Sequence, residues 1–128
     1  MTTVLVVDDE FGVAEVLEAI LVDEGYRVLT AVNGKQGMES LAREKPDLVL
    51  LDFMMPVLDG PGMLRAMAAD PHLASIPVIL MSSLPEQTVA ARVSGHVGFV
   101  RKPFSIETVI AAVAKALPPG PRHPSPEP

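Results

Sequence analysis

The sequence predicts an α/β fold in which five parallel strands form a doubly wound sheet, with five helices on its two faces. Up to residue 117, strand-like apolar runs alternate with helix-like segments. Alternation of this kind is typical of right-handed β-α-β units that place helices on both faces of a sheet. Three of the runs are apolar over four consecutive residues, as expected for strands that are buried on both faces.

Five segments are predicted to be strands. Asn33-Gly34 forms a turn after the second segment, and Pro46 and Pro77 mark the starts of the third and fourth. The predicted strands span residues 4–7, 26–32, 48–51, 78–81 and 99–101.

Five helices are predicted, most of them from apolar residues at helical spacing. Gly25 ends the first helix, and Ser105 is placed to cap the last. The helix predicted for residues 85–94 has the weakest amphipathic pattern, because Val and Ala dominate this segment. The predicted helices span residues 11–24, 35–44, 61–69, 85–94 and 106–117. The side chains expected to face the core are Val13, Val16, Leu17, Ile20 and Leu21, then Met38, Leu41 and Ala42, then Met63, Leu64 and Met67, and finally Ile106, Val109, Ile110, Val113 and Leu117.

Composition narrows the class of protein. A chain of 128 residues with 48% apolar residues is long enough for one domain with its own core. It contains no cysteine, which excludes thiol catalysis, and its formal net charge of −6 argues against direct contact with nucleic acid. No apolar run approaches the roughly 20 residues that span a bilayer. We therefore expect a cytoplasmic protein whose partners are other proteins.

The last eleven residues differ from the rest. Residues 118–128 contain six prolines and almost no other apolar residue, so they cannot form a core and should be disordered. We expect residues 1–117 to be the folded domain and residues 118–128 to be a proline-rich tail or the remnant of a linker. The PxxP spacing in this segment is also compatible with a ligand for a proline-recognising module.

Polar side chains follow four of the predicted strands. Asp8 and Asp9 follow the first, Asp52 the third, Ser82 the fourth and Lys102 the fifth. Ligands of open parallel sheets bind beyond the carboxyl ends of the strands, so these groups should meet in one crevice. Close carboxylates suit Mg²⁺, while a hydroxyl and an ammonium group suit phosphoryl oxygens.

Each of these residues also has an ordinary explanation. Acidic residues stabilise a helix N-terminus, a serine can satisfy a backbone group at a strand end, and most lysines lie on the surface. Asp52 is harder to explain in this way, because a charge directly after four apolar residues is costly to bury unless a cation compensates it. The joint placement of all five groups favours a functional site.

These residues resemble a response-regulator receiver domain of the CheY-like family, over residues 3 to about 117. The resemblance rests on the acidic pair Asp8-Asp9, on Asp52-Phe-Met-Met-Pro56 followed by Asp59-Gly60, and on Ser82-Ser83 and Lys102-Pro103-Phe104. It implies strand order 2-1-3-4-5 in a flavodoxin-like sheet.

The resemblance also implies a chemistry. Asp52 would accept a phosphoryl group from a sensor histidine kinase or phosphotransfer protein of a two-component system. Mg²⁺ would be held by Asp9, Asp52 and the backbone carbonyl of Met54, with Asp8 acting through water. Lys102 and Ser82 would bind the phosphoryl oxygens, and the Lys102-Pro103 bond would be cis. Such a domain is not an enzyme with a separate substrate, although it catalyses its own phosphorylation and dephosphorylation.

The family's switch would involve Ser82 and Phe99. Ser82 moves toward the phosphate and Phe99 fills the space left behind, so that the face made by the fourth helix, fifth strand and fifth helix gains or loses a downstream protein. Here Ser82 stands for the commoner threonine and Phe99 for the commoner tyrosine. Met54 and Leu84, two residues beyond Asp52 and Ser82, are apolar where many relatives are polar, and we expect both to limit the access of water.

Two other functions remain open at this point. A phosphohydrolase of the haloacid dehalogenase type would also place an aspartate after a strand, but that family repeats the aspartate two residues on, where this chain has Met54. A structural receiver-like module that is never phosphorylated is the other alternative. Such modules usually lose part of the acidic pair, the acceptor or the lysine, all of which are present here.

Overall fold

The computed structural model describes residues 1–117, so the predicted tail, residues 118–128, lies outside the described residues. Strands and helices alternate along the described chain. The strands are β1 (Thr3–Val7), β2 (Arg27–Ala31), β3 (Leu48–Asp52), β4 (Val78–Ser82) and β5 (Gly98–Arg101). The helices are α1 (Phe11–Asp23), α2 (Gly34–Arg43), α3 (Gly60–Ala68), α4 (Glu86–Ala90) and α5 (Ile106–Ala116).

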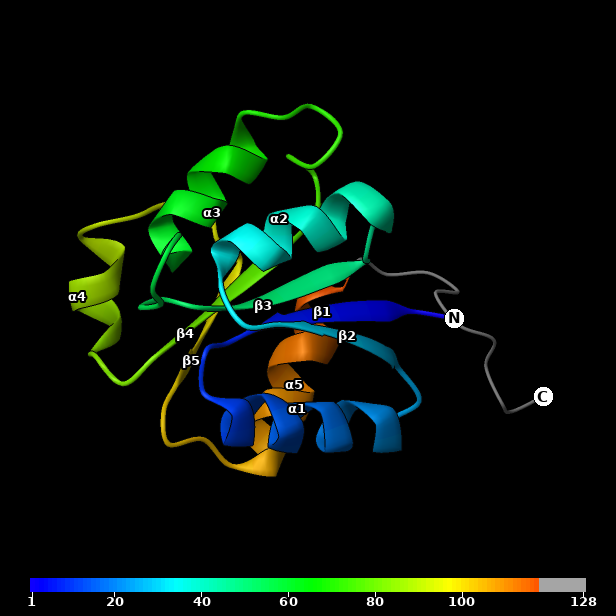
Figure 1. Ribbon diagram of the computed structural model, residues 1–128. Helices are drawn as coiled ribbons and strands as arrows, with labels where there is room; N and C mark the ends of the chain where they lie inside the picture. The colour runs from blue at the N-terminus through cyan, green and yellow to red at the C-terminus, as the bar shows by residue number, and fades with distance from the viewer. Residues whose placement is uncertain (118–128) are drawn as a thin grey trace.

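The five strands form one parallel sheet in the order β2-β1-β3-β4-β5. Helices α1 and α5 cover one face, and α2 and α3 cover the other, with α4 at the β5 side of the molecule (Figure 1). The predicted doubly wound fold and its strand order are confirmed. None of the helices formed by residues 1–117 is long and apolar enough to cross a membrane.

The three inner strands explain the continuous apolar runs in the sequence. Every residue of β1, β3 and β4 is buried, because helices cover both faces of the sheet at these positions. The edge strands β2 and β5 are partly exposed. Burial therefore follows the position of each strand in the sheet.

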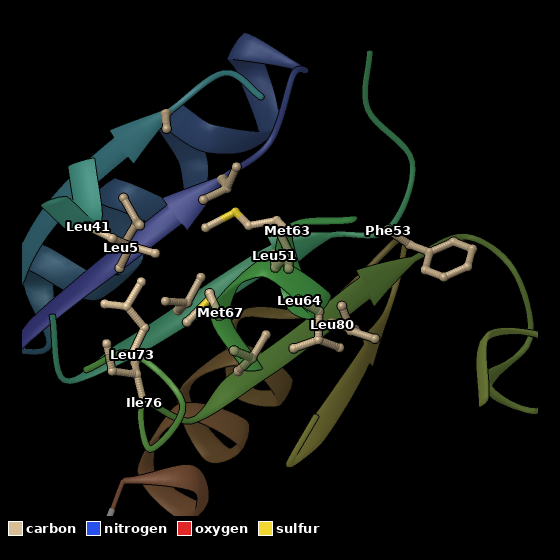
Figure 2. Close-up of a cluster of buried hydrophobic side chains, with 14 of the residues drawn as sticks. Leu5, Leu41, Leu51, Phe53, Met63, Leu64, Met67, Leu73, Ile76 and Leu80 are labelled. Atoms are coloured by element: carbon tan, nitrogen blue, oxygen red, sulfur yellow. The ribbon is translucent and has the colours of Figure 1, made fainter. Parts of the chain in front are cut away.

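Two apolar clusters hold the helices on the sheet. One joins α2, α3 and Val89 of α4 to the sheet. Figure 2 shows the strand residues Leu5, Leu51 and Leu80 in this cluster together with the α3 side chains Met63, Leu64 and Met67. The other joins α1 and α5 to the opposite face. Phe53 belongs to the first cluster and lies at its edge, directly beyond the end of β3 (Figure 2).

Three side chains predicted to face the core are exposed instead. Val16 points away from the core because the face of α1 that packs on the sheet is formed by other residues. These are Ala14, Leu17, Ile20 and Leu21. Ala42 is exposed because α2 packs through small residues, including Gly37 and Ser40. Ile106 is the first residue of α5 and is 55% exposed. Helical spacing alone does not fix how far each apolar stripe is turned toward the sheet.

Helix α4 is shorter than predicted. It covers only Glu86–Ala90 where we expected residues 85–94. Pro85 provides no side-chain cap, and Val89 is the one buried residue in the helix. Thr88, Val89 and Val93 are β-branched and so favour a helix less than unbranched residues. With little burial to stabilise further turns, the chain leaves the helix and reaches Gly95, which has a φ of 99°.

Gly60 provides a test of packing next to β3. A Cβ atom at this position would lie 2.5 Å from the Asp52 carbonyl oxygen and 2.8 Å from the Phe53 Cα atom. Because both neighbours are backbone atoms, we expect Gly60→Ala to lower the free energy of unfolding by about 2 kcal/mol. Urea unfolding monitored by circular dichroism measures this change.

Gly12→Ala is the matched control. A Cβ atom at Gly12 meets nothing within 4 Å, and alanine favours a helix over glycine by up to about 1 kcal/mol. This variant should be as stable as the parent or slightly more stable. Equal effects of the two substitutions would show that the close approach at Gly60 is not what matters.

Candidate functional site

The parallel sheet brings the predicted polar residues to one edge. Asp52 and Ser82 are the last residues of β3 and β4, Asp8 follows β1 directly, and Lys102 follows β5. The Lys102 backbone N–H donates to the Ser82 carbonyl oxygen at 2.8 Å, which joins two of these strand ends. The Lys102-Pro103 peptide bond is cis, as predicted.

Lys102 is the centre of a cluster of ion pairs. Its Nζ atom lies 2.8 Å from Asp8 Oδ2, 3.1 Å from Glu10 Oε1 and 3.3 Å from Asp52 Oδ1. Asp8 is completely buried, and its other oxygen accepts a hydrogen bond from the Glu10 backbone N–H at 2.9 Å. Lys102 is therefore held in place by three carboxylates, of which Asp52 is one.

Three carboxylates at this edge of the sheet could hold a metal ion. One oxygen from each of Asp8, Asp9 and Asp52 lies within 4.8 Å of the other two. Asp9 is exposed whereas Asp8 and Asp52 are buried, so the group opens toward solvent on one side. Hard oxygen donors of this kind suit Mg²⁺, which is usually bound by one or two carboxylates together with water and phosphate oxygens. The donor set fits a magnesium site.

The charges at the site compete. Burial and the nearby carboxylates of Asp8 and Asp9 raise the pKa of Asp52 to about 7, although the charge and hydrogen bond of Lys102 oppose the shift. Burial lowers the pKa of Lys102, but its contacts with Asp8, Asp52 and Glu10 outweigh this and raise the pKa above the ordinary lysine value. The ammonium group alone does not compensate the carboxylates fully, so a further cation would be stabilising.

A pocket of ≈ 720 Å³ opens over these groups. Asp9, Asp52, Lys102, Ser82 and Met54 all contribute to its lining. The Ser82 Oγ atom accepts a hydrogen bond from the Leu84 backbone N–H at 3.0 Å. A phosphoryl-sized group at the Asp52 carboxylate would thus share the pocket with a hydroxyl and an ammonium group.

Met54, Leu84 and Phe99 were also predicted to act near this site. Met54 lies at the pocket and is 63% exposed. Leu84 is not among the residues lining the pocket, and its partly buried side chain packs against the apolar cluster of α2 and α3. Phe99, on β5, is half-buried against the same cluster. Of the three, only Met54 lies at the pocket, whereas Leu84 and Phe99 pack against the apolar core.

Glu10 is a site residue that the sequence reasoning missed. It is not among the residues predicted to form the site, yet its carboxylate pairs with Lys102 and it lines the pocket. The signal was its position directly after Asp8 and Asp9 at the junction between β1 and α1. A third acidic residue there can reach Lys102, which follows β5 at the same edge of the sheet.

Comparisons with known proteins agree with this geometry. The family model of the response regulator receiver domain matches residues 4–114. Sporulation initiation phosphotransferase F of Bacillus subtilis (strain 168) is 35% identical over 117 residues, which cover 90% of this chain and 93% of that protein. The signal receiver domain of a signal transduction histidine kinase from Syntrophus aciditrophicus has a TM-score of 0.84 at 30% identity, covering 91% of this chain and 90% of that one.

Some relatives are longer proteins. The probable transcriptional regulator ycf27 of Porphyra purpurea is 37% identical over 118 residues, which cover 89% of this chain but 46% of the relative. The chain thus spans about half the length of several curated proteins that it matches. The match to the family model extends over most of the chain, and the sheet order and the acidic site agree with it. This chain belongs to the family of response regulator receiver domains of two-component signal transduction.

Proposed function

We propose that this domain accepts a phosphoryl group on the carboxylate of Asp52, from a phosphohistidine of a histidine kinase or phosphotransfer protein. The observation that carries the proposal is the cluster in which Asp52 lies 3.3 Å from Lys102 and shares a pocket with Ser82. Phosphoryl transfer depends mainly on positioning and on neutralising the charge of the transferred group. A buried carboxylate beside a fixed ammonium group provides both.

In the transfer step, an Asp52 oxygen forms a bond to phosphorus while the bond between phosphorus and the donor nitrogen breaks. The electron pair of that bond goes to the departing imidazole. Asp52 must be ionised to attack, and its pKa of about 7 means that part of the protein holds a proton at neutral pH in the absence of a further cation. Lys102 is placed to balance the charge of the phosphoryl oxygens.

The acidic group supports a role for Mg²⁺. Asp9, Asp52 and the backbone carbonyl of Met54 would hold the ion, and Asp8 would act through water. When bound, Mg²⁺ would neutralise carboxylate and phosphoryl charge in the pocket. Its presence would also keep Asp52 ionised at neutral pH, because a nearby cation favours the charged form of a carboxyl group.

A protein partner would recognise the phosphorylated state of the domain. A phosphoryl group adds negative charge and strong acceptors near Ser82, whose hydroxyl oxygen accepts a hydrogen bond from the Leu84 N–H in this structure. Movement of Ser82 toward the phosphate would let the half-buried Phe99 ring shift. We propose that the face formed by α4, β5 and α5 then changes its affinity for a downstream protein.

Incubation with Mg²⁺ and a small acyl phosphate, followed by intact mass spectrometry, tests this function. A receiver gives a single phosphoryl adduct. Turnover of many phosphate esters would favour a haloacid-dehalogenase-type hydrolase, for which Met54 stands where a second aspartate is needed. If the protein shows neither an adduct nor turnover, this result would favour a structural module that is not phosphorylated.

The lifetime of the phosphoryl group provides a further prediction. An attacking water needs a polar group to position it, and the thioether of Met54 supplies none at the rim of the pocket. We expect slow hydrolysis in the parent and several-fold faster decay in Met54→Asn, equivalent to about 1 kcal/mol of barrier. Decay of the phosphorylated protein can be followed by intact mass.

Val57→Asn is the matched control for this experiment. Val57 lies in the same loop, is 77% exposed and does not line the pocket. Its φ of 71° is a conformation that asparagine tolerates better than valine. Decay should be unchanged in this variant, and equal rates in parent and Met54→Asn would contradict the role of Met54.

A further inference from the structure

A groove of ≈ 460 Å³ runs between α3 and the segment that follows α4. Leu64 and Ala68 form its apolar wall on α3, and Ala90, Ala91 and Val93 form the opposite wall. Figure 1 shows α4 as a single short helix beside α3 at one end of the sheet. Because α4 stops at Ala90, no further helical turn covers this side of α3.

Two arginines give the groove its charge. Arg65, in the last turn of α3, and Arg92, just after α4, line it, and the lining found among residues 1–117 contains no acidic side chain. Neither arginine is in an ion pair within the described part of the chain. Two unpaired cations at one groove stand out in a chain with a formal net charge of −6.

The position of Arg92 is partly fixed. Its guanidinium group lies 5.9 Å from the centre of the Phe53 ring, at a distance typical of a cation–π contact. This contact is with an aromatic ring and uses no carboxylate, so the guanidinium N–H groups can still bind a carboxylate in a bidentate manner. Arg92 is thus held at the groove and can still bind an anion.

The groove also continues toward the phosphoacceptor site. Pro61, Arg65 and Arg92 line both this groove and an adjoining pocket of ≈ 540 Å³, which extends to Met54 and Asp9. Asp9 and Asp59 also line the adjoining pocket, and their carboxylates would repel an anion there. An anion would therefore be bound best in the groove itself, whose lining among residues 1–117 contains no carboxylate.

We propose that this groove is a docking site for an acidic segment of a partner protein, in which Asp or Glu is flanked by apolar residues. The apolar walls would contact the apolar side chains, and Arg65 and Arg92 would bind the carboxylates. The groove shares the end of α4 with the face formed by α4, β5 and α5, but it lies between α4 and α3 and contains no residue of β5 or α5. Binding of an acidic segment in the groove does not require phosphorylation of Asp52. The docking proposal can therefore be tested even if the proposed function fails.

Selection of random 12-residue peptides displayed on phage, against the full chain, tests the proposal without a known partner. The variant Arg65→Gln/Arg92→Gln removes both cations, and Arg43→Gln/Lys115→Gln removes two exposed cations outside the groove as the matched control. We expect peptides rich in Asp and Glu beside apolar residues. A synthetic copy of the best one should bind parent and control equally and bind the groove variant at least tenfold more weakly.

Amide chemical shifts of ¹⁵N-labelled protein locate the bound peptide. Shifts confined to α3 and residues 90–94 are expected. The proposal is wrong if acidic peptides are not enriched, if affinity survives loss of both arginines, or if the shifts lie elsewhere. It is also wrong if millimolar inorganic phosphate, at matched ionic strength, displaces the peptide and shifts the same amides, because the groove would then be a small-anion site. Should the double variant fail to fold, Arg65→Gln alone, which leaves the Arg92–Phe53 contact intact, carries the test.

Discussion

Asp52→Asn is expected to abolish incorporation of a phosphoryl group from an acyl phosphate in the presence of Mg²⁺. The amide is a poor nucleophile. Asp52 contacts Lys102 at 3.3 Å and lines the pocket, whereas Asp8, which is buried 2.8 Å from Lys102, is not among the residues that line it. We expect the phosphorylated fraction to fall at least about 100-fold. Intact mass spectrometry after a fixed incubation measures this fraction.

Asp59→Asn is the control for this loss. Asp59 follows Asp52 in the sequence by seven residues, is exposed, and caps α3 through a hydrogen bond to the Gly62 N–H. Asparagine caps a helix about as well as aspartate, so the fold should not change. Labelling should persist in Asp59→Asn. A phosphoryl adduct that remains in Asp52→Asn would mean that another side chain is the acceptor.

The sheet could be predicted because its inner strands have an unmistakable composition. The runs that end at Val7, Leu51 and Met81 are continuously apolar, and only strands covered on both faces require this. The alternation with helices then restricts the fold to a doubly wound sheet. The strand order itself followed from the family resemblance, since composition alone does not say which strands are neighbours.

The helices were harder to predict in detail. Val16, Ala42 and Ile106 lie at helical spacing with core residues yet are exposed, because the rotation of each helix is set by its contacts with the sheet. Small residues such as Gly37 and Ser40 carry no hydropathy signal but allow α2 to approach the sheet. The length of α4 depends on burial, which is only partial at Val93 beyond Val89, and this too is a property of tertiary structure.

The candidate site could be predicted because strand ends in a parallel sheet lie together. Asp8, Asp9, Asp52, Ser82 and Lys102 all contribute to one cluster around the pocket. Glu10 was missed because a side chain's reach across the sheet edge cannot be read from spacing. The packing of Leu84 against the core could not be predicted either, because the direction of a side chain in a loop depends on the backbone angles.

Without metal, Asp52→Asn is expected to be more stable than the parent above neutral pH. Because the pKa of Asp52 is raised from 3.8 to about 7 in the folded state, the folded protein binds a proton more tightly than the unfolded chain. Stability should therefore rise as pH falls from about 8 toward 4 and should fall as pH rises through about 7. A shift of about three pKa units corresponds to at most about 4 kcal/mol.

Urea unfolding in EDTA at pH 5, 6, 7 and 8 measures this effect, with Glu18→Gln as the control that removes an exposed carboxylate on α1. The advantage of Asp52→Asn should be about 2 to 4 kcal/mol at pH 8 and much smaller at pH 5, where Asp52 in the folded parent is mostly protonated. Lys102 keeps its contacts with Asp8 and Glu10 in the variant, so the ammonium group is not left unpaired.

Magnesium should reverse the order of stability. A cation that binds the folded state alone stabilises it by mass action, and it also offsets the repulsion among Asp8, Asp9 and Asp52. The melting temperature of the parent should therefore rise with Mg²⁺ concentration, whereas that of Asp52→Asn should rise much less. Glu18→Gln should respond as the parent does. If Mg²⁺ raised the melting temperatures of the parent and Asp52→Asn equally, Asp52 would not be part of the site that binds the ion. Magnesium would then not act by relieving the repulsion among these three carboxylates.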